Sequence, residues 1–148
     1  MNIAPQVLVK FVRNGAIMPR FMSEGSAGAD LSACIEDNVC LKPGDFEMIP
    51  TGLALSIPDG FEGEIRPRSG LAARYGVTLL NSPGTIDSDY RGEINVILIN
   101  HGKKDFSINN GDRIAQLLIK PVNRLKYIQV EELPDTDRGN AGFGSTGI

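Results

Sequence analysis

Hydrophobic residues occur along this chain in short runs separated by Gly, Pro, Asn and Asp. Runs of this length, rich in Val, Ile, Leu and Phe and bounded by turn residues, predict β-strands. They lie at residues 7–12, 29–35, 46–49, 52–57, 64–67, 77–81, 94–100, 113–119 and 125–130. Many short strands with turns between them predict an all-β barrel or sandwich.

One of these strands differs from the others in its hydrophobic pattern. The sequence VILI at residues 96–99 carries apolar side chains on both faces, which indicates burial on both sides. In a chain of this size, we expect such a strand near the centre of a sandwich or beneath another subunit.

A single segment predicts a helix. Nine prolines and 17 glycines, spread along the chain, leave little room for helices of normal length. The sequence SGLAARYG at residues 69–76 is the exception, because Ser69 is a favourable N-cap and Gly76 is favourable just after a helix. A helix in this segment would have about two turns.

The composition fits one globular domain. A chain of 148 residues with 41% hydrophobic residues can bury a core of its own. Its 15 basic and 18 acidic residues give a net charge of -3 without any block of like charge, which argues against nucleic-acid partners and against a membrane surface. The first residues lack the basic flank and apolar run of a signal peptide, so we expect a cytoplasmic location.

Cysteine and histidine are scarce. Cys34 and Cys40 lack the spacing of a metal or redox centre, and we expect both to be small apolar residues in or beside strands. His101 is the only histidine, so a zinc site with several histidines is excluded. Its polar surroundings predict a turn after a strand.

Polar side chains gather with glycine in five segments that are candidates for a functional site. Their sequences are SAGADL at residues 26–31, RPRSGLA at 66–72, GTIDSDYRGE at 84–93, GDRIAQ at 111–116 and RGNAGFGSTG at 138–147. None of them matches the lysine-containing P-loop, so a phosphate site in this chain would have another form.

Each segment, taken alone, has a structural explanation beside a functional one. Arg68 and Ser69 can hold a phosphate at the start of the short helix, or Ser69 only caps that helix. Asp87 can act as a general base beside a phosphate, or Asp87 and Asp89 only shape a tight β-hairpin. Gln116 can donate a hydrogen bond to an anion, or it is only a polar residue at the edge of a strand. The composition of the glycine-rich tail is that of a disordered end.

Taken together and in order, the five segments resemble the five motifs of the homotrimeric deoxyuridine triphosphatase family, the dUTPases. The resemblance covers nearly the whole chain. It implies an all-β, jelly-roll-like barrel or sandwich of many short strands with one short helix. It also implies a homotrimer with three active sites at the subunit interfaces. Each site would take its first, second and fourth motifs from one subunit, its third from another and its fifth from the remaining one.

The resemblance implies an enzyme that hydrolyses dUTP to dUMP and pyrophosphate with Mg²⁺, by attack of water on the α-phosphorus. Such an enzyme limits the incorporation of uracil into DNA and supplies dUMP for thymidylate synthesis. By similarity, Asp87 is the general base that deprotonates the attacking water. The Mg²⁺ ion would be held mainly by triphosphate oxygens and water, with Asp30 nearby and acting through water.

Two groups of motif residues are expected to bind the substrate. The phosphate contacts by similarity are Arg68, Ser69, Gly70 and Gln116. The nucleoside contacts by similarity are Asn81, Thr85, Ile86, Asp87 and Tyr90. The expected hairpin leaves no space for the 5-methyl group of thymine, and Tyr90 would clash with a ribose 2′-hydroxyl.

The resemblance divides the chain into a β-domain at residues 1–136 and a flexible glycine-rich arm at residues 137–148. The arm would close over the active site of a neighbouring subunit. Its expected substrate contacts are Arg138, Phe143, Gly144, Ser145 and Thr146. Phe143 can stack on uracil, and the others can surround the triphosphate. Ala141 stands where the family often has another glycine. We expect it to change how ordered the arm is without abolishing activity.

Three other functions fit the sequence less well. The dCTP deaminases and the bifunctional deaminase-dUTPases share the fold but match this chain less well in the second motif. A regulatory nucleotide-binding homologue without activity is a further alternative, although residues of every catalytic type are present. A purely structural β-module would not need all of these motifs in one chain.

Overall fold

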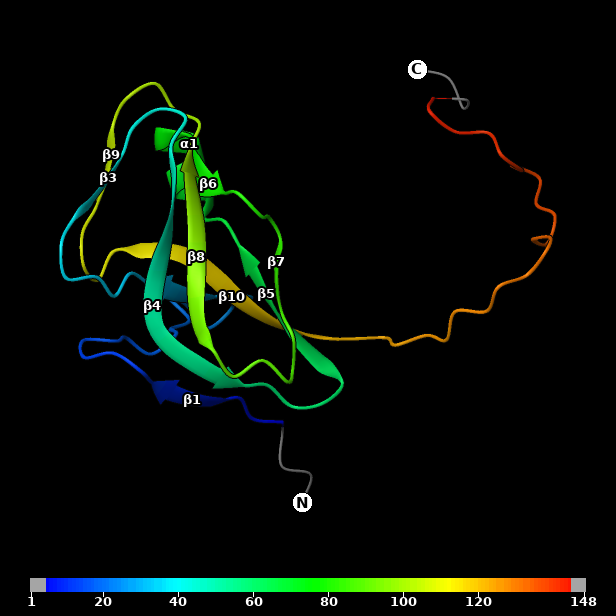
Figure 1. The fold of residues 1–148 in the computed structure, drawn as a ribbon, viewed down its shortest axis with the longest axis horizontal. Coiled ribbons are helices and arrows are strands. Elements are labelled where there is room, and N and C mark those ends of the chain that lie inside the picture. Colours follow the sequence, from blue (N-terminus) through cyan, green and yellow to red (C-terminus); the bar gives the residue numbers. More distant parts are fainter. Residues whose placement is uncertain (1–4, 145–148) are drawn as a thin grey trace.

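The computed structural model describes residues 5–144, and these residues form two four-stranded sheets, one pair of short strands and one short helix (Figure 1). The first sheet has the order β1 (Leu8–Phe11), β4 (Phe46–Ser56), β8 (Glu93–Asn100) and β6 (Val77–Leu79). The second sheet has the order β2 (Ala29–Ser32), β10 (Arg113–Pro121), β5 (Phe61–Arg66) and β7 (Gly84–Ile86). The remaining pair is β3 (Val39–Leu41) with β9 (Phe106–Ile108), and the helix is α1 (Ser69–Tyr75).

The two larger sheets enclose one apolar core, which confirms the expected all-β sandwich of the jelly-roll type. Ile94, Val96 and Leu98 of β8 alternate with more exposed residues and are at most 1% exposed. They belong to the same buried cluster as Ile65 of β5 and Leu117 of β10. Full burial of each such side chain stabilises the fold by about 1.5–3 kcal/mol relative to exposure, so this core holds the strands that carry the polar motifs.

The outer face of β8 is only partly covered. The strand is central in its sheet, between β4 and β6, as its double apolar pattern predicts. On the face away from the core, Ile97 pairs with Met48 and Ile99 pairs with Phe46. Met48 and Phe46 are 58% and 59% exposed. An apolar surface therefore remains on this side of the single chain.

Two of the expected strands form one. In the sequence, Pro50 and Thr51 separated the runs at residues 46–49 and 52–57, but β4 continues through both runs. The register against β8 shifts between Pro50 and Ala54, where Gly52 has a φ of +71°. The strand accommodates these residues by a local irregularity instead of ending, which is the usual role of a bulge.

The strand expected at residues 125–130 is absent from the described chain. Leu125, Tyr127 and Ile128 are 78%, 97% and 71% exposed. After β10 the chain runs away from the two sheets as an extended trace (Figure 1). A short apolar run forms a strand only where a partner strand is available, and this segment has none within the described part of its own chain.

The helix begins one residue earlier than predicted. Ser69 is the first residue of α1, and Arg68 is the N-cap, without a hydrogen bond from its side chain to the helix. The prediction that Ser69 caps the helix is therefore wrong. Gly76 does end it, because its φ of 69° turns the chain out of the helix, and its N–H donates to the carbonyl oxygens of Ala72 and Leu71. Within the described residues, no helix is long and apolar enough to cross a membrane.

The two cysteines occupy different environments. Cys34 is buried, and its Sγ atom donates to the carbonyl oxygen of Asn14 at 3.4 Å. Cys40 lies in β3 but is exposed, so the expectation of an apolar filler holds only for Cys34.

Candidate active site

Three charged side chains from distant parts of the chain meet at one edge of the second sheet. Arg113 Nη1 donates to Asp30 Oδ2 at 3.0 Å, and Arg68 Nη2 lies 3.6 Å from the same oxygen. The Asp30 carboxylate is only 14% exposed. Arg68 also donates to the carbonyl oxygen of Arg113 at 2.9 Å. These contacts join the first, second and fourth motifs, and they hold two guanidinium groups in fixed positions beside one another.

The sheet register explains why Gln116 lies in the same place. On β10, Gln116 pairs with Asp30 of β2 on one side and with Arg66 of β5 on the other. Its Nε2 atom donates to the carbonyl oxygen of Pro67 at 3.0 Å. The side chain passes directly over Gly28, where an added Cβ would lie 2.4 Å from Gln116 Oε1. Gly28 is therefore required for this position of the amide.

An open groove lies beside these residues. Its volume is about 330 Å³, and Arg68 and Arg113 line it together with Tyr75 and Phe106, whose rings are 5.1 Å apart. Ser69 and Gly70 are exposed at the start of α1, next to Arg68. The structure thus brings Asp30, Arg68, Ser69, Gly70 and Gln116 into one region. The groove offers two arginines to an anion, which suits phosphate oxygens.

The third motif does not form the expected β-hairpin. β7 pairs with β5 in the second sheet, whereas β8 pairs with β4 and β6 in the first. Residues 87–92 therefore form a crossover loop between the two sheets. The glycines and aspartates of this segment predicted a tight turn, but the strands on either side belong to different sheets and diverge.

Two cavities occupy the space next to this crossover loop. The smaller, of about 40 Å³, is lined by Ile65, Leu79, Asn81, Gly84, Thr85, Ile86, Asn95, Val96 and Ile97. The larger, of about 240 Å³, is lined by Met48, Thr85, Ile86, Asp87, Tyr90, Glu93, Ile94 and Asn95. The expected nucleoside contacts are therefore grouped here. Asp87 is exposed at the mouth of the second cavity, where its carboxylate can reach a bound molecule.

Tyr90 is held across the end of the crossover loop. Its hydroxyl donates to the carbonyl oxygen of Glu93 at 3.0 Å. An added Cβ on Gly92 would lie 2.3 Å from the Tyr90 hydroxyl oxygen, so only glycine leaves room for the ring. Tyr90 remains 44% exposed. One wall of the larger cavity is therefore an aromatic ring with a fixed orientation.

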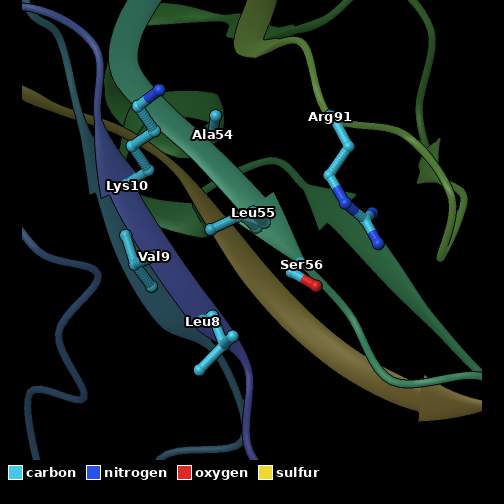
Figure 2. A pocket seen from close by; sticks show the side chains of 7 residues that line it. All are labelled: Leu8, Val9, Lys10, Ala54, Leu55, Ser56 and Arg91. Carbon is cyan, nitrogen blue, oxygen red and sulfur yellow. The ribbon is translucent and has the colours of Figure 1, made fainter.

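Arg91 stabilises the loop from the other side. Its Nη1 atom donates to the carbonyl oxygens of Ser88 at 2.6 Å and Tyr90 at 3.0 Å. The side chain extends toward the end of β4 near Ser56 and lines a separate cavity of about 300 Å³ with residues of β1 and β4 (Figure 2). Arg91 therefore shapes the loop without lining the two cavities beside Asp87.

Sequence reasoning missed an ion pair at the start of β8. Arg13 and Glu93 form two hydrogen bonds, and Glu93 also lines the cavity with Asp87. The hydrogen bond from Arg13 lowers the pKa of Glu93 below its ordinary value, and the Gly52 N–H acts in the same direction. The sequence signal was weak, because Glu93 appears only as the end of the third motif and Arg13 lies in no motif.

The arm residues lie apart from both regions. Arg138 donates to the carbonyl oxygen of Ala141, and Phe143 is fully exposed with a φ of 50°. The segment that carries them and Gly144 extends away from the sheets (Figure 1). Ser145 and Thr146 lie outside the described residues. Residues 138–144, the described part of the fifth motif, therefore do not meet the other four motifs within a single chain.

Comparison with known proteins agrees with these motifs. The family model described as dUTPase matches residues 14–147 of the chain. This chain belongs to the dUTPase family. The deoxyuridine 5'-triphosphate nucleotidohydrolase of Syntrophotalea carbinolica is 55% identical over 142 residues, which cover 96% of this chain and 97% of that protein.

Solved dUTPase structures share the fold. The dUTPase of Staphylococcus bacteriophage 80alpha, in a mutant form with dUpNHpp, superposes with a TM-score of 0.87 at 27% identity and covers 97% of this chain and 99% of its own. A mutant dUTPase from phage phi11 of S. aureus has a TM-score of 0.78 at 26% identity and covers 86% of this chain and 97% of its own. That phage structure is described as showing the coordination of a structural Mg(II) ion.

Proposed function

We propose that this dUTPase-family chain hydrolyses dUTP to dUMP and pyrophosphate. The observation that carries the proposal is the family match across residues 14–147, a range that includes all five motifs. The cavities beside Asp87 would take the nucleoside, and the groove beside Arg68 and Arg113 would take the phosphates. In cells, this reaction would limit the incorporation of uracil into DNA and supply dUMP.

Asp87 is the general base of the proposed reaction. Its exposed carboxylate accepts a proton from water, and the water oxygen forms a bond to the α-phosphorus. The bond between the α-phosphorus and the oxygen that bridges to the β-phosphorus breaks. The electron pair of that bond leaves with pyrophosphate, and the inverted phosphorus remains in dUMP.

The second, fourth and first motifs position the triphosphate. Arg68, Ser69 and Gly70 donate to its oxygens at the start of α1, and Gln116 donates from the neighbouring strand. Asp30 holds Arg68 and Arg113 in place through the contacts described above. Charged donors fixed before the substrate binds lose little conformational entropy when it does.

The available carboxylates fit a Mg²⁺ ion held mainly by the substrate. Among residues 5–144, no three His, Cys, Asp or Glu side chains group together as a metal site. Asp30 already accepts a hydrogen bond from one arginine and lies close to a second, so it suits contact with the ion through water. When bound, Mg²⁺ neutralises charge on the triphosphate.

Selection of the nucleoside falls to the third motif. Asn81 and the backbone at Thr85 and Ile86 line the smaller of the two cavities, where they can pair with the polar edge of uracil. The small size of this cavity disfavours a 5-methyl group. We propose that the deoxyribose packs on the ring of Tyr90, with which a 2′-hydroxyl would clash. A site of this kind rejects analogues strongly, because the wrong partner leaves buried polar groups unpaired.

The proposed site is shared between the subunits of a homotrimer. Among residues 5–144 of one chain, the cavities beside Asp87 and the groove beside Arg68 have no lining residue in common. The exposed apolar surface around Phe46 and Met48 offers a contact for another subunit.

We propose that residues 1–136 form the β-domain and that residues 137–148 are an arm. That arm would bring Arg138, Phe143, Gly144, Ser145 and Thr146 to a neighbour's substrate.

Hydrolysis in labelled water tests the proposed reaction. With dUTP, Mg²⁺ and ¹⁸O-water, we expect pyrophosphate release and one labelled oxygen in dUMP, because water attacks the α-phosphorus. We expect much slower release from dTTP, dCTP and UTP in parallel reactions. Label in pyrophosphate would contradict the point of attack. Ammonia released from dCTP would favour a deaminase, and no turnover of dUTP would contradict the proposed function.

A substitution at Gly28 tests the role of Gln116. In Gly28→Ala the new Cβ would displace the Gln116 amide, because the two atoms would lie 2.4 Å apart. Loss of one hydrogen bond to a charged phosphate corresponds to about 1.5–3 kcal/mol, so we expect KM for dUTP to rise about 10-fold or more. The measurement is steady-state kinetics with dUTP.

Gly25→Ala is the matched control, because an added Cβ at Gly25 meets no atom within 4 Å. Its KM should equal that of the unaltered protein. An unchanged KM in Gly28→Ala would show that Gln116 does not contact the substrate.

A further inference from the structure

We propose that Arg13 is a positioning residue for the crossover loop, and that through Glu93 it sets how strongly Tyr90 discriminates between deoxyribose and ribose. The inference rests on the proposed function and adds a residue outside the five motifs. Arg13 lies in the loop after β1, 80 residues from Glu93 in the sequence.

The contact between these two side chains has the geometry of a fork. Arg13 Nε donates to Glu93 Oε1 at 2.6 Å, and Arg13 Nη2 donates to Glu93 Oε2 at 3.0 Å. The Glu93 side chain is 20% exposed and that of Arg13 is 49% exposed. Two parallel hydrogen bonds between a guanidinium and a carboxylate restrict rotation of both groups, which a single contact does not.

A third group completes the anchor of Glu93. The N–H of Gly52 donates to Glu93 Oε1 at 3.0 Å, while the carbonyl oxygen of Gly52 accepts a hydrogen bond from Val12 N at 2.8 Å. Gly52 has a φ of +71°, and an added Cβ there would lie 2.8 Å from the Ala16 Cβ. The irregularity in β4 therefore brings the loop after β1 and the start of β8 together at one residue.

Glu93 connects this anchor to the candidate nucleoside cavity. Its carbonyl oxygen accepts hydrogen bonds from the Tyr90 hydroxyl at 3.0 Å and from Asn95 Nδ2 at 3.1 Å. Tyr90, Glu93 and Asn95 all line the cavity that also contains Asp87. The side chain of Glu93 is thus fixed by Arg13 and Gly52, and its backbone fixes the ring that faces the proposed sugar position.

A simple structural role for this ion pair predicts a different result. Partly exposed ion pairs contribute little to stability, so removing one of them should hardly change the fold. A pair that only stabilised the fold would alter the amount of active protein and would affect all substrates equally. A pair that positions Tyr90 would instead alter the ratio between substrates, because the fit of the ring to the sugar changes.

The test compares kcat/KM for dUTP with kcat/KM for UTP in Arg13→Ala. This ratio does not depend on the fraction of folded protein. Since small displacements in a site cost large factors in rate, we expect the ratio to fall about 10-fold. Arg13→Lys keeps the charge but loses the fork, so we expect a smaller fall. Lys120→Ala is the control, because it removes another partly exposed ion pair, with Glu64, and should leave the ratio unchanged.

Hydrogen exchange gives a second measurement that does not depend on catalysis. In Arg13→Ala we expect faster exchange at residues 84–93 and at Gly52 than in Lys120→Ala. If the unaltered protein failed to hydrolyse dUTP, the proposed function would be lost, but this comparison would still decide the anchoring role.

A dUTP-to-UTP ratio within twofold of the unaltered value in Arg13→Ala would overturn the proposal, as would unchanged exchange at residues 84–93. If Arg13→Ala did not fold, Arg13→Lys would be judged by the same two criteria.

Discussion

Asp87→Asn is expected to bind dUTP with unchanged affinity and to lower kcat by at least about 100-fold, the lower end of the usual range for general acid-base catalysis. The substitution keeps the size of the side chain but removes the basic oxygen that accepts the proton of the attacking water. Because Asp87 is exposed at the edge of its cavity, the change should not disturb the core. Calorimetry measures the affinity of the variant for dUTP, and single-turnover kinetics measures the rate of the chemical step.

Asp89→Asn is the matched control for this experiment. Asp89 is also exposed and lies in the same crossover loop, but it does not line either cavity beside Asp87. We expect its kcat to remain close to that of the unaltered protein. A substantial rate in Asp87→Asn would remove Asp87 as the base, and an equal loss in both variants would indicate a general effect of charge in the loop.

Deleting residues 138–148 is expected to leave a folded protein and to lower kcat/KM for dUTP by about 100-fold or more. Stacking of an aromatic side chain on a base is worth about 1–3 kcal/mol, and contacts from Arg138 to the triphosphate would add to the loss of Phe143. Arg138 and Phe143 are exposed, and the segment at residues 138–144 runs away from the sheets, so removal of this described segment takes away no core residue. Kinetics with dUTP and the thermal unfolding midpoint measure the two parts of this prediction.

Phe143→Ala separates stacking from the other arm contacts. We expect it to show about a tenth of the unaltered kcat/KM or less, in keeping with the loss of a single stacked ring. Full activity after the deletion would show that the tail is only a frayed end. A lowered unfolding midpoint would instead show that the tail contributes to the fold, against its exposure in the single chain.

The sequence predicted the strands of the core because their signal is local. β8 and β10 are continuous runs rich in Ile, Leu and Val, and in β8 burial alternates from Glu93 to Leu98, with the apolar residues at 94, 96 and 98 facing the core. The short helix and its end at Gly76 were also predicted, since glycine is favoured just after a helix, where φ is positive. The three-residue strands β3, β7 and β9 were not predicted, whereas β6, of the same length, was predicted because it begins the longer apolar run at residues 77–81.

Two wrong predictions, the hairpin at residues 84–93 and the strand at residues 125–130, share one cause. Residues 84–93 have the composition of a hairpin turn, and residues 125–130 have the apolar content of a short strand. Whether β7 pairs with β8, or residues 125–130 pair with anything, depends on which strand edges are available in the assembled sheets. That availability is a property of the whole fold, and a local pattern does not contain it.

By itself, the sequence determined the all-β class of the fold, its family and the residue types of the five motifs. The order of the motifs and the positions of the short apolar runs are properties of the sequence alone. Only the tertiary structure decided which side chains meet. The Arg113–Asp30 and Arg13–Glu93 pairs join residues 83 and 80 positions apart, and Gly28 lies under Gln116. Such contacts depend on the register of paired strands and on the bulge in β4, and these arise only when separate parts of the chain pack together.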